Sequence, residues 1–287
     1  MNPQAQNLII VLSGVLLVIS IGCTPAEKTD APPPPAQDTP LPAPPELQAA
    51  RLLYQRPDGI YLANPATGNG RLIIPGGRYP RWFRDGRRFA FLRGQQILLA
   101  DIDTLPTERL LATAKEPAGV AVRPDGRAVL FIEGDTIRQV ALDTGTDTTL
   151  LSGFAFRELA AGTNAIVATV KVPLRGFRMM RFDLPDGSAT TLGSGCSASL
   201  SPDGTTATLN LEGHRQLALV NLQTHDTRQH LPAPAPHQLD NQYWSNHTNW
   251  IAAVCHNGNV MLQRISDHAT WQTTTTRDAD RPDLFVP

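Results

Sequence analysis

Histidine, the residue type best suited to acid–base chemistry and metal binding near neutral pH, is confined to the C-terminal third of this chain. His225, His230 and His237 are spaced five and seven residues apart, which places them on no shared face of a strand or helix. The sequence has no His-Glu-x-x-His segment, and Asp101-Ile102-Asp103 is too short for a calcium loop. We therefore predict that the histidines lie in turns or at the surface, with no metal site and no cofactor.

A nucleophilic serine or cysteine is the second kind of chemistry to consider. The segment Gly193-Ser194-Gly195-Cys196-Ser197 comes nearest to the Gly-x-Ser-x-Gly motif of serine hydrolases, but it has no second glycine after a central serine. It also lies between two predicted strands, and the chain leaves no room for a separate hydrolase domain. The sequence therefore predicts no catalytic residues.

Arginine forms the one local concentration of charge. The whole chain is balanced, with 25 Lys and Arg against 26 Asp and Glu, which argues against nucleic acid as a partner. Between residues 71 and 93, however, seven arginines accompany a single acid, Asp85. We predict a surface for an anionic partner there; the alternative is a scattered, solvated surface. Its candidate residues are Arg78, Arg81, Arg84, Arg87 and Arg88.

A repeating pattern of strands must position these side chains. The Asp-Gly pair recurs at Asp85-Gly86, Asp125-Gly126 and Asp203-Gly204, each time before a strand-like run, and weaker copies occur at residues 160–163 and 245–248. A repeat of about forty residues is typical of a propeller blade of four short strands. The Asp can bond its own backbone and the Gly supplies a positive φ, so we predict turn residues rather than acids or ligands.

The repeats predict an all-β, six-bladed β-propeller over residues 51–287, with four antiparallel strands in each blade. The sixth unit is split, because residues 52–74 provide three strands and residues 280–287 provide one. Pairing of Leu284–Val286 with Leu52–Gln55 would close the ring and remove the unpaired edges. The five complete units begin near Tyr79, Gly119, Phe154, Cys196 and Asn241.

The two cysteines of the repeat region are predicted to remain separate. Cys196 begins an innermost strand and Cys255 ends a second strand one blade on, which places their Cα atoms too far apart for a disulfide. We favour two small buried residues, and a disulfide remains the alternative for an exported chain.

The Ser-Pro-Asp-Gly box, followed by a β-branched strand and a Thr-Gly turn, resembles the WD-repeat-like propeller repeat of TolB and related periplasmic proteins. The box is intact at Ser201–Gly204, has Arg123 in place of Ser in another copy, and lacks the Pro before Asp85. The resemblance covers nearly all of residues 51–287. TolB has a separate α/β domain before its propeller, whereas this chain has a Pro-rich segment there.

The start of the chain resembles a bacterial lipoprotein. The apolar run Leu8–Ile21 is too short to span a membrane and suits a signal peptide over residues 1–22. It ends at a lipobox-like Ser20-Ile21-Gly22-Cys23, which implies lipidation of Cys23. Residues 23–50 contain nine prolines between Pro25 and Pro45 and are predicted to form a disordered, lipid-anchored linker. The alternative is an uncleaved signal anchor, and either arrangement is extracytoplasmic.

Repeats that cover the whole region, without a catalytic motif, favour a membrane-tethered, non-enzymatic scaffold that binds a protein or cell-envelope component. The alternatives are an enzyme, or a small-molecule- or sugar-binding protein, that uses the central channel, and a structural domain without a ligand. A propeller can also gather ligands from separate blades into its channel. Polar side chains that converge in the channel would favour an enzyme or a small-molecule-binding protein. A channel without such side chains, but with a charged rim, would favour the scaffold.

Overall fold

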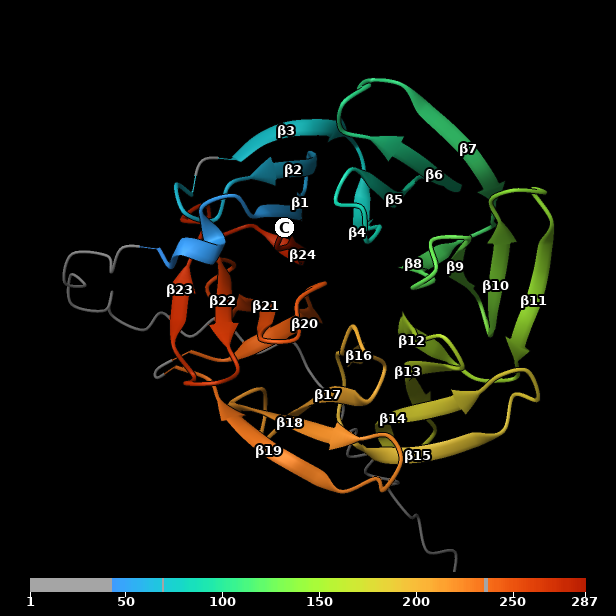
Figure 1. Ribbon diagram of the computed structural model, residues 1–287. Coiled ribbons are helices and arrows are strands. Elements are labelled where there is room, and N and C mark those ends of the chain that lie inside the picture. The colour runs from blue at the N-terminus through green and yellow to red at the C-terminus, as the bar shows by residue number, and fades with distance from the viewer. Residues whose placement is uncertain (1–42, 69, 235–236) are drawn as a thin grey trace, which may run out of the picture.

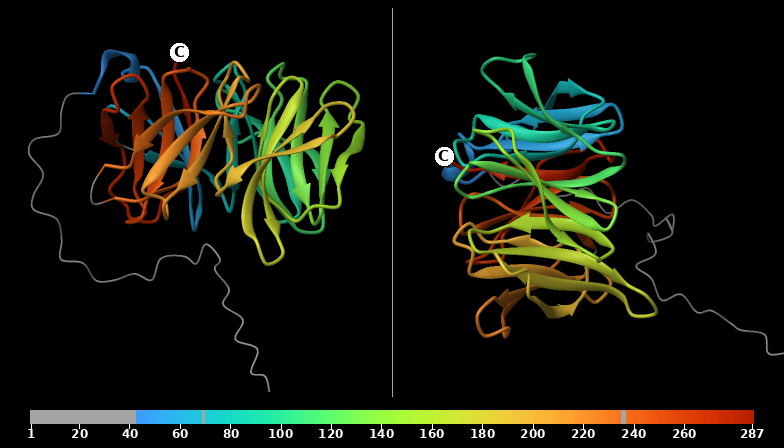
Figure 2. Two further views of the ribbon diagram at one scale, coloured as in Figure 1. Left: turned by 90° about the horizontal axis from the view of Figure 1, so that it is seen from below. Right: turned by 90° about the vertical axis from the view of Figure 1, so that its right-hand side faces the viewer.

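The computed structural model describes residues 43–68, 70–234 and 237–287. The predicted signal peptide, Cys23 and most of the Pro-rich linker lie outside these residues. The described residues form six four-stranded antiparallel sheets set radially around a central axis (Figure 1), which confirms the predicted six-bladed β-propeller. Viewed from the side, the sheets form a thick disc (Figure 2).

Each blade places its first strand nearest the axis and its last strand at the rim. Blade 1 consists of β24 (Asp280–Phe285), β1 (Arg51–Arg56), β2 (Gly59–Ala63) and β3 (Gly70–Pro75). Blade 2 consists of β4 (Arg78–Trp82), β5 (Arg88–Arg93), β6 (Gln96–Asp101) and β7 (Glu108–Thr113). Blade 3 consists of β8 (Pro117–Val122), β9 (Ala128–Glu133), β10 (Thr136–Ala141) and β11 (Asp147–Ser152).

The remaining three blades repeat this order. Blade 4 consists of β12 (Phe156–Ala161), β13 (Ala165–Val172), β14 (Gly176–Asp183) and β15 (Ala189–Ser194). Blade 5 consists of β16 (Ser199–Leu200), β17 (Thr206–Leu211), β18 (Gln216–Asn221) and β19 (Thr227–Pro232). Blade 6 consists of β20 (Leu239–Trp244), β21 (Trp250–Cys255), β22 (Val260–Arg264) and β23 (Thr270–Gln272).

Apolar side chains fill the spaces between neighbouring blades. The second strands are buried on both faces, so they read as nearly continuous apolar runs; all six residues of β21 are buried. Phe83 and Phe131 pack between blades 2 and 3, and Ile132 and Leu159 pack between blades 3 and 4. The core is therefore a ring of interfaces between blades, and the channel side chains are left for other roles.

The ring closes between the two ends of the described chain, as the sequence predicts. β24 pairs antiparallel with β1, with Leu284 opposite Leu52 and Phe285 opposite Arg51. The Asn246 side chain of blade 6 accepts a hydrogen bond from Val286 N and donates one to Val286 O, both at 2.7 Å. These contacts fix the C-terminal strand in blade 1 and join it to blade 6.

The end of the predicted linker packs on the propeller. Residues 45–47 form a short 3-10 turn, η1 (Pro45–Leu47). Leu47 is 0% exposed and Ala50 is 2% exposed, in a cluster that includes Trp250 of β21. The propeller therefore buries Leu47, an apolar side chain that lies four residues before the predicted boundary at residue 51.

Within the described ranges, no helix is both long enough and apolar enough to cross a membrane.

Candidate functional site

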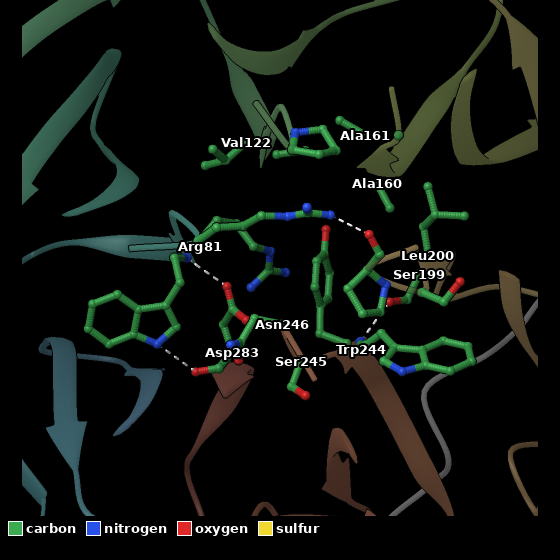
Figure 3. Close-up of a pocket in the computed structure, with 18 of the residues that line it drawn as sticks. Arg81, Val122, Ala160, Ala161, Ser199, Leu200, Trp244, Ser245, Asn246 and Asp283 are labelled. Carbon is green, nitrogen blue, oxygen red and sulfur yellow. Dashed lines mark hydrogen bonds between the residues drawn. The ribbon is translucent and has the colours of Figure 1, made fainter. Parts of the chain in front are cut away.

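A pocket opens on the channel axis at the end where the innermost strands finish (Figure 3). All six blades line it, each with the last residues of its innermost strand or the turn that follows. Its volume is about 120 Å³. This end of the channel also carries the Asp-Gly turns, so the repeat itself builds the rim.

Arg81 is the most deeply placed cation of this pocket. It is 4% exposed, and its Cζ lies 3.3 Å from the centroid of the Tyr243 ring of blade 6. Its Nη1 donates to Pro80 O at 2.6 Å, but its Nε is buried without a hydrogen-bond partner in the described structure. Its Nε is shielded from solvent, so the contribution of Arg81 to the pocket is its positive charge, which favours an anionic group there.

Two further guanidinium groups lie at the mouth of the pocket. Arg84 is exposed, and its Nη2 donates to Pro202 O, so the side chain reaches across the mouth from blade 2 to blade 5. Arg123 donates from Nη2 to Thr163 O at 3.1 Å. Both groups bond to carbonyl oxygens rather than to carboxylates, so their positive charge is available to a partner.

Asp283 is the one acid among the residues that line this pocket. It is 7% exposed, and its Oδ2 accepts a hydrogen bond from Trp82 N at 2.7 Å (Figure 3). Burial raises the pKa of Asp283 to about 7, although Arg81 and the Trp82 N–H act in the opposite direction. The carboxyl is therefore only partly ionised at neutral pH, and the mouth carries a surplus of positive charge.

Deeper in the channel, polar side chains converge and bond to one another. Arg281 Nη1 and Glu158 Oε1 lie 2.7 Å apart, with side chains 17% and 12% exposed. Tyr243 donates from its hydroxyl to Leu159 O at 2.5 Å. Polar convergence is the feature expected of a channel that binds a small molecule. Here the ion pair and the Tyr243 hydrogen bond use part of this polar capacity, while Arg281 Nε is buried without a hydrogen-bond partner among the described residues.

The five arginines of the predicted partner surface do not share one face. Arg81 and Arg84 line the pocket. Arg87 and Arg88 belong to the same turn but lie beside acids: Arg87 Nε is 2.8 Å from Asp103 and Arg88 Nε is 2.6 Å from Asp85. Arg78 lies at the other end of β4, where it donates to the Gly94 carbonyl in the β5–β6 turn. Strand direction explains the split, because β4 carries its first and last residues to opposite ends of the blade.

The Asp and Gly residues of the repeat box lie in tight turns. Asp85, Asp125 and Asp203 each accept hydrogen bonds through Oδ1 from the backbone N–H two residues on, at 2.9, 2.9 and 3.0 Å. The glycines that follow have positive φ in all three copies. These are Gly86 at 64°, Gly126 at 68° and Gly204 at 73°.

One group of chemically reactive side chains was missed by the sequence analysis. Cys196, His214 and Asp240 place a sulfur, a ring nitrogen and a carboxylate oxygen within 4.8 Å of one another. His214 lies in a turn, as predicted, and it is the one histidine of the described residues that joins such a group. Cys196 and Asp240 are 44 residues apart, as Gly204 and Thr248 are, so aligning the repeats would have placed them at equivalent positions of neighbouring blades.

The two cysteines of the repeats are separate thiols, as predicted. Cys255 is 2% exposed in the core of blade 6, whereas Cys196 is only partly buried. The prediction of a buried residue therefore holds for Cys255 and is wrong for Cys196. Cys196 precedes β16, at the channel end of its blade, where solvent reaches it.

Comparison with known proteins gives structural similarity alone. No protein-family model matches the chain, and no curated protein matches it in sequence. Among solved structures, TolB from Acinetobacter baumannii is similar with a TM-score of 0.66 and 17% identity, over 83% of this chain and 67% of TolB. A chain of a nidogen/laminin complex has a TM-score of 0.69 and 10% identity, over 82% of this chain and 98% of that one.

Hydrazine synthase from Kuenenia stuttgartiensis is a third similar structure, with a TM-score of 0.51 and 13% identity, over 69% of this chain and 66% of that one. At these identities the similarity establishes the fold. It supports the expected TolB-like β-propeller and leaves the function to be argued from this chain's own residues.

Proposed function

We propose that this protein is a membrane-tethered extracytoplasmic propeller that binds a protein partner at the mouth of its channel, through an acidic segment of that partner. The observation that carries the proposal is the charge of the pocket. Arg81, Arg84 and Arg123 bring three guanidinium groups to a pocket whose single acid is the buried Asp283, and burial raises the pKa of that carboxyl to about 7. A site of this charge favours an anionic group.

The shape of the pocket and its rim also supports a macromolecular partner. The rim is made by turns from all six blades, so a partner can contact the whole rim while one of its side chains enters the pocket. The deeper channel is spanned by the Arg281–Glu158 ion pair. A ligand therefore has limited depth available and must gain most of its contact area outside the pocket.

Two of the similar solved structures suit this proposal. One of them is a chain from a complex of nidogen with laminin, which is an assembly of proteins. The other is TolB, and the repeat boxes of this chain resemble the repeat of that periplasmic family. The lipobox-like segment ending at Cys23 supports a tether that holds the propeller outside the cytoplasm.

A charge-reversal pair tests the binding surface. Arg84 and Arg87 lie in the same turn and are both exposed, but only Arg84 lines the pocket. Binding of a labelled Asp- and Glu-rich peptide, measured by fluorescence anisotropy, should weaken by roughly 10-fold in Arg84→Glu. Arg87→Glu should bind like the wild type, and the difference should shrink as salt is added. Equal binding by both variants and the wild type would overturn the proposal.

Photo-crosslinking can identify the partner. Thr163 is an exposed rim residue that lines the pocket, and Thr148 is an exposed residue of the outermost strand of blade 3. A photo-reactive phenylalanine analogue at Thr163 should capture an envelope protein that the same analogue at Thr148 does not. Identical capture at the two positions would place the binding surface elsewhere. Capture of a small metabolite instead would favour the channel alternative.

A further inference from the structure

The β13–β14 hairpin of blade 4 extends outward at the end of the channel opposite the pocket. Residues 160–163, just before β13, line the pocket, so β13 runs away from it. β13 and β14 have eight residues each, and no other strand of the described residues exceeds six. Two extra residues of ~3.3 Å carry the turn roughly 7 Å farther out. Figure 2 shows this yellow hairpin reaching beyond the disc.

The tip of this hairpin presents an apolar side chain to solvent. The turn consists of Pro173, Leu174 and Arg175, and Leu174 is 104% exposed. The other exposed large apolar side chains of the described residues are Leu110 at 52% and Leu72 at 40%. Leu174 also has a φ of 61°, which favours glycine or asparagine over leucine. Neither core packing nor turn chemistry therefore explains a leucine at this position.

The charged side chains of the hairpin tip are all basic. Lys171 and Arg175 are exposed and Arg178 is half-buried, and the chain has no acid between Glu158 and Asp183. Among the described residues, no carboxylate lies within ion-pair distance of Lys171, Arg175 or Arg178. Their positive charge is therefore available to an anionic surface outside the chain.

A groove along the hairpin combines the same two properties. Its volume is about 520 Å³, and Phe154, Val170, Val172 and Met180 give it an apolar wall. The register places Val170 opposite Arg178, so the apolar wall and a cation share one face of the sheet. The three cations of the hairpin tip line this groove, and no acid does. An apolar wall edged by cations is complementary to a molecule with a hydrocarbon chain and an anionic headgroup.

We propose that the β13–β14 hairpin docks on an anionic lipid membrane, with Leu174 among the acyl chains and Lys171, Arg175 and Arg178 at the headgroup phosphates. A turn of three residues offers far less area than a stable protein–protein interface buries. Insertion into a membrane surface needs only an apolar tip and basic residues beside it. A lipid surface therefore suits this hairpin better than a protein does.

This orientation leaves the pocket accessible, because the pocket lies at the other end of the channel. The chain enters the propeller at the pocket end, where the first residue of β1, Arg51, is opposite Phe285. An extended chain from Cys23 to Pro44 spans roughly 70 Å. A six-residue strand is ~20 Å long, so a tether at Cys23 is long enough to reach a membrane on the far side of the disc.

A fluorescent amino acid whose emission depends on polarity tests the contact when it replaces Leu174 in the full-length chain. The chain is incorporated into vesicles of phosphatidylcholine alone or of phosphatidylcholine mixed with phosphatidylglycerol. We expect a blue shift of the emission in the mixed vesicles, which added salt reduces. The matched control carries the same amino acid at Leu110, an exposed leucine of β7, and should show no shift.

Charge reversal on the hairpin tests the role of the cations. In Lys171→Glu with Arg175→Glu, the ratio of docked to undocked hairpin, read from the emission at residue 174, should fall at least ~10-fold. Arg109→Glu with Arg127→Glu changes the net charge equally at exposed residues outside the hairpin and should leave the ratio unchanged. Thermal unfolding checks that each variant is folded.

The proposal is overturned if the probe at residue 174 shows no shift in the mixed vesicles, or the same shift as the probe at residue 110. It is equally overturned if the shift is as large in phosphatidylcholine alone, or if charge reversal on the hairpin leaves it intact. A shift produced by an Asp- and Glu-rich peptide without vesicles would assign the hairpin to a protein instead. Flotation of the chain with vesicles reports the tether separately, and peptide binding by Arg84→Glu reports the pocket.

Discussion

The buried carboxyl of Asp283 should make the propeller less stable as the pH rises, which is opposite to the usual effect of a carboxyl in a folded protein. Burial raises its pKa from 3.8 to about 7, so the folded state holds this proton over a range in which the unfolded chain has lost it. The resulting stabilisation is fully present below pH 3.8 and is lost as the pH rises through about 7. At about 1.4 kcal/mol per pKa unit, the change amounts to about 4 kcal/mol.

The substitution Asp283→Asn isolates this contribution. Asparagine keeps a side-chain oxygen that can accept the Trp82 N–H bond, now 2.7 Å long, but it cannot ionise. The free energy of unfolding, measured by urea denaturation from pH 4 to pH 8, should fall with pH more steeply in the wild type. The variant should therefore gain about 4 kcal/mol relative to the wild type across this range.

Asp85→Asn is the matched control. Burial opposes ionisation of Asp85, but hydrogen bonds from the Arg88 and Arg87 backbone N–H groups and from the Arg88 side chain outweigh it and lower the pKa. The stability that Asp85 contributes is thus present above its unfolded pKa of 3.8 and is lost as the pH falls. A difference between Asp283→Asn and wild type that is independent of pH, or that has the sign expected for Asp85, would refute the reasoning for Asp283.

Three further predictions concern the ring and its tether. Gly86→Ala should destabilise the fold by at least ~2 kcal/mol more than Gly204→Ala, because a Cβ at Gly86 would lie 2.3 Å from the Phe285 ring whereas nothing lies within 4 Å at Gly204; equal unfolding free energies would contradict this. Deleting residues 281–287 removes most of β24 and should abolish cooperative thermal unfolding, since it opens an unpaired edge on β1. Mass spectrometry should find a diacylglyceryl group on Cys23 that Cys23→Ala lacks; an intact Met1 terminus without lipid would instead indicate a signal anchor.

Local chemistry explains why the fold could be predicted from sequence. Each blade is one supersecondary unit, and the turn after its innermost strand needs a positive φ that Gly86, Gly126 and Gly204 provide at little steric cost. The spacing of these turns gives the number of blades. The incomplete units at the two ends then give the closure through β24 and β1, because neither end can satisfy its sheet edge alone.

Which arginine side chains face the channel depended on the tertiary structure. Arg78 and Arg84 are close in sequence, but the strand between them carries them to opposite ends of a blade, and Arg81 turns inward to stack on Tyr243. Strand periodicity could not show this, because a bulge shifts the register of β4 between Arg78 and Arg81. Such register shifts decide which side chains of an innermost strand face the channel.

The sequence by itself therefore determined the repeat, the number of blades and the way in which the ring closes, since these follow from turn chemistry and from the need to pair strand edges. Only the tertiary structure decided which side chains meet. Cys196 and Asp240 occupy equivalent positions of neighbouring repeats, but the repeat spacing alone does not bring His214, from the turn between β17 and β18, beside them. They come together because neighbouring blades pack at a fixed angle about one axis, which brings a turn of blade 5 beside the first strand of blade 6.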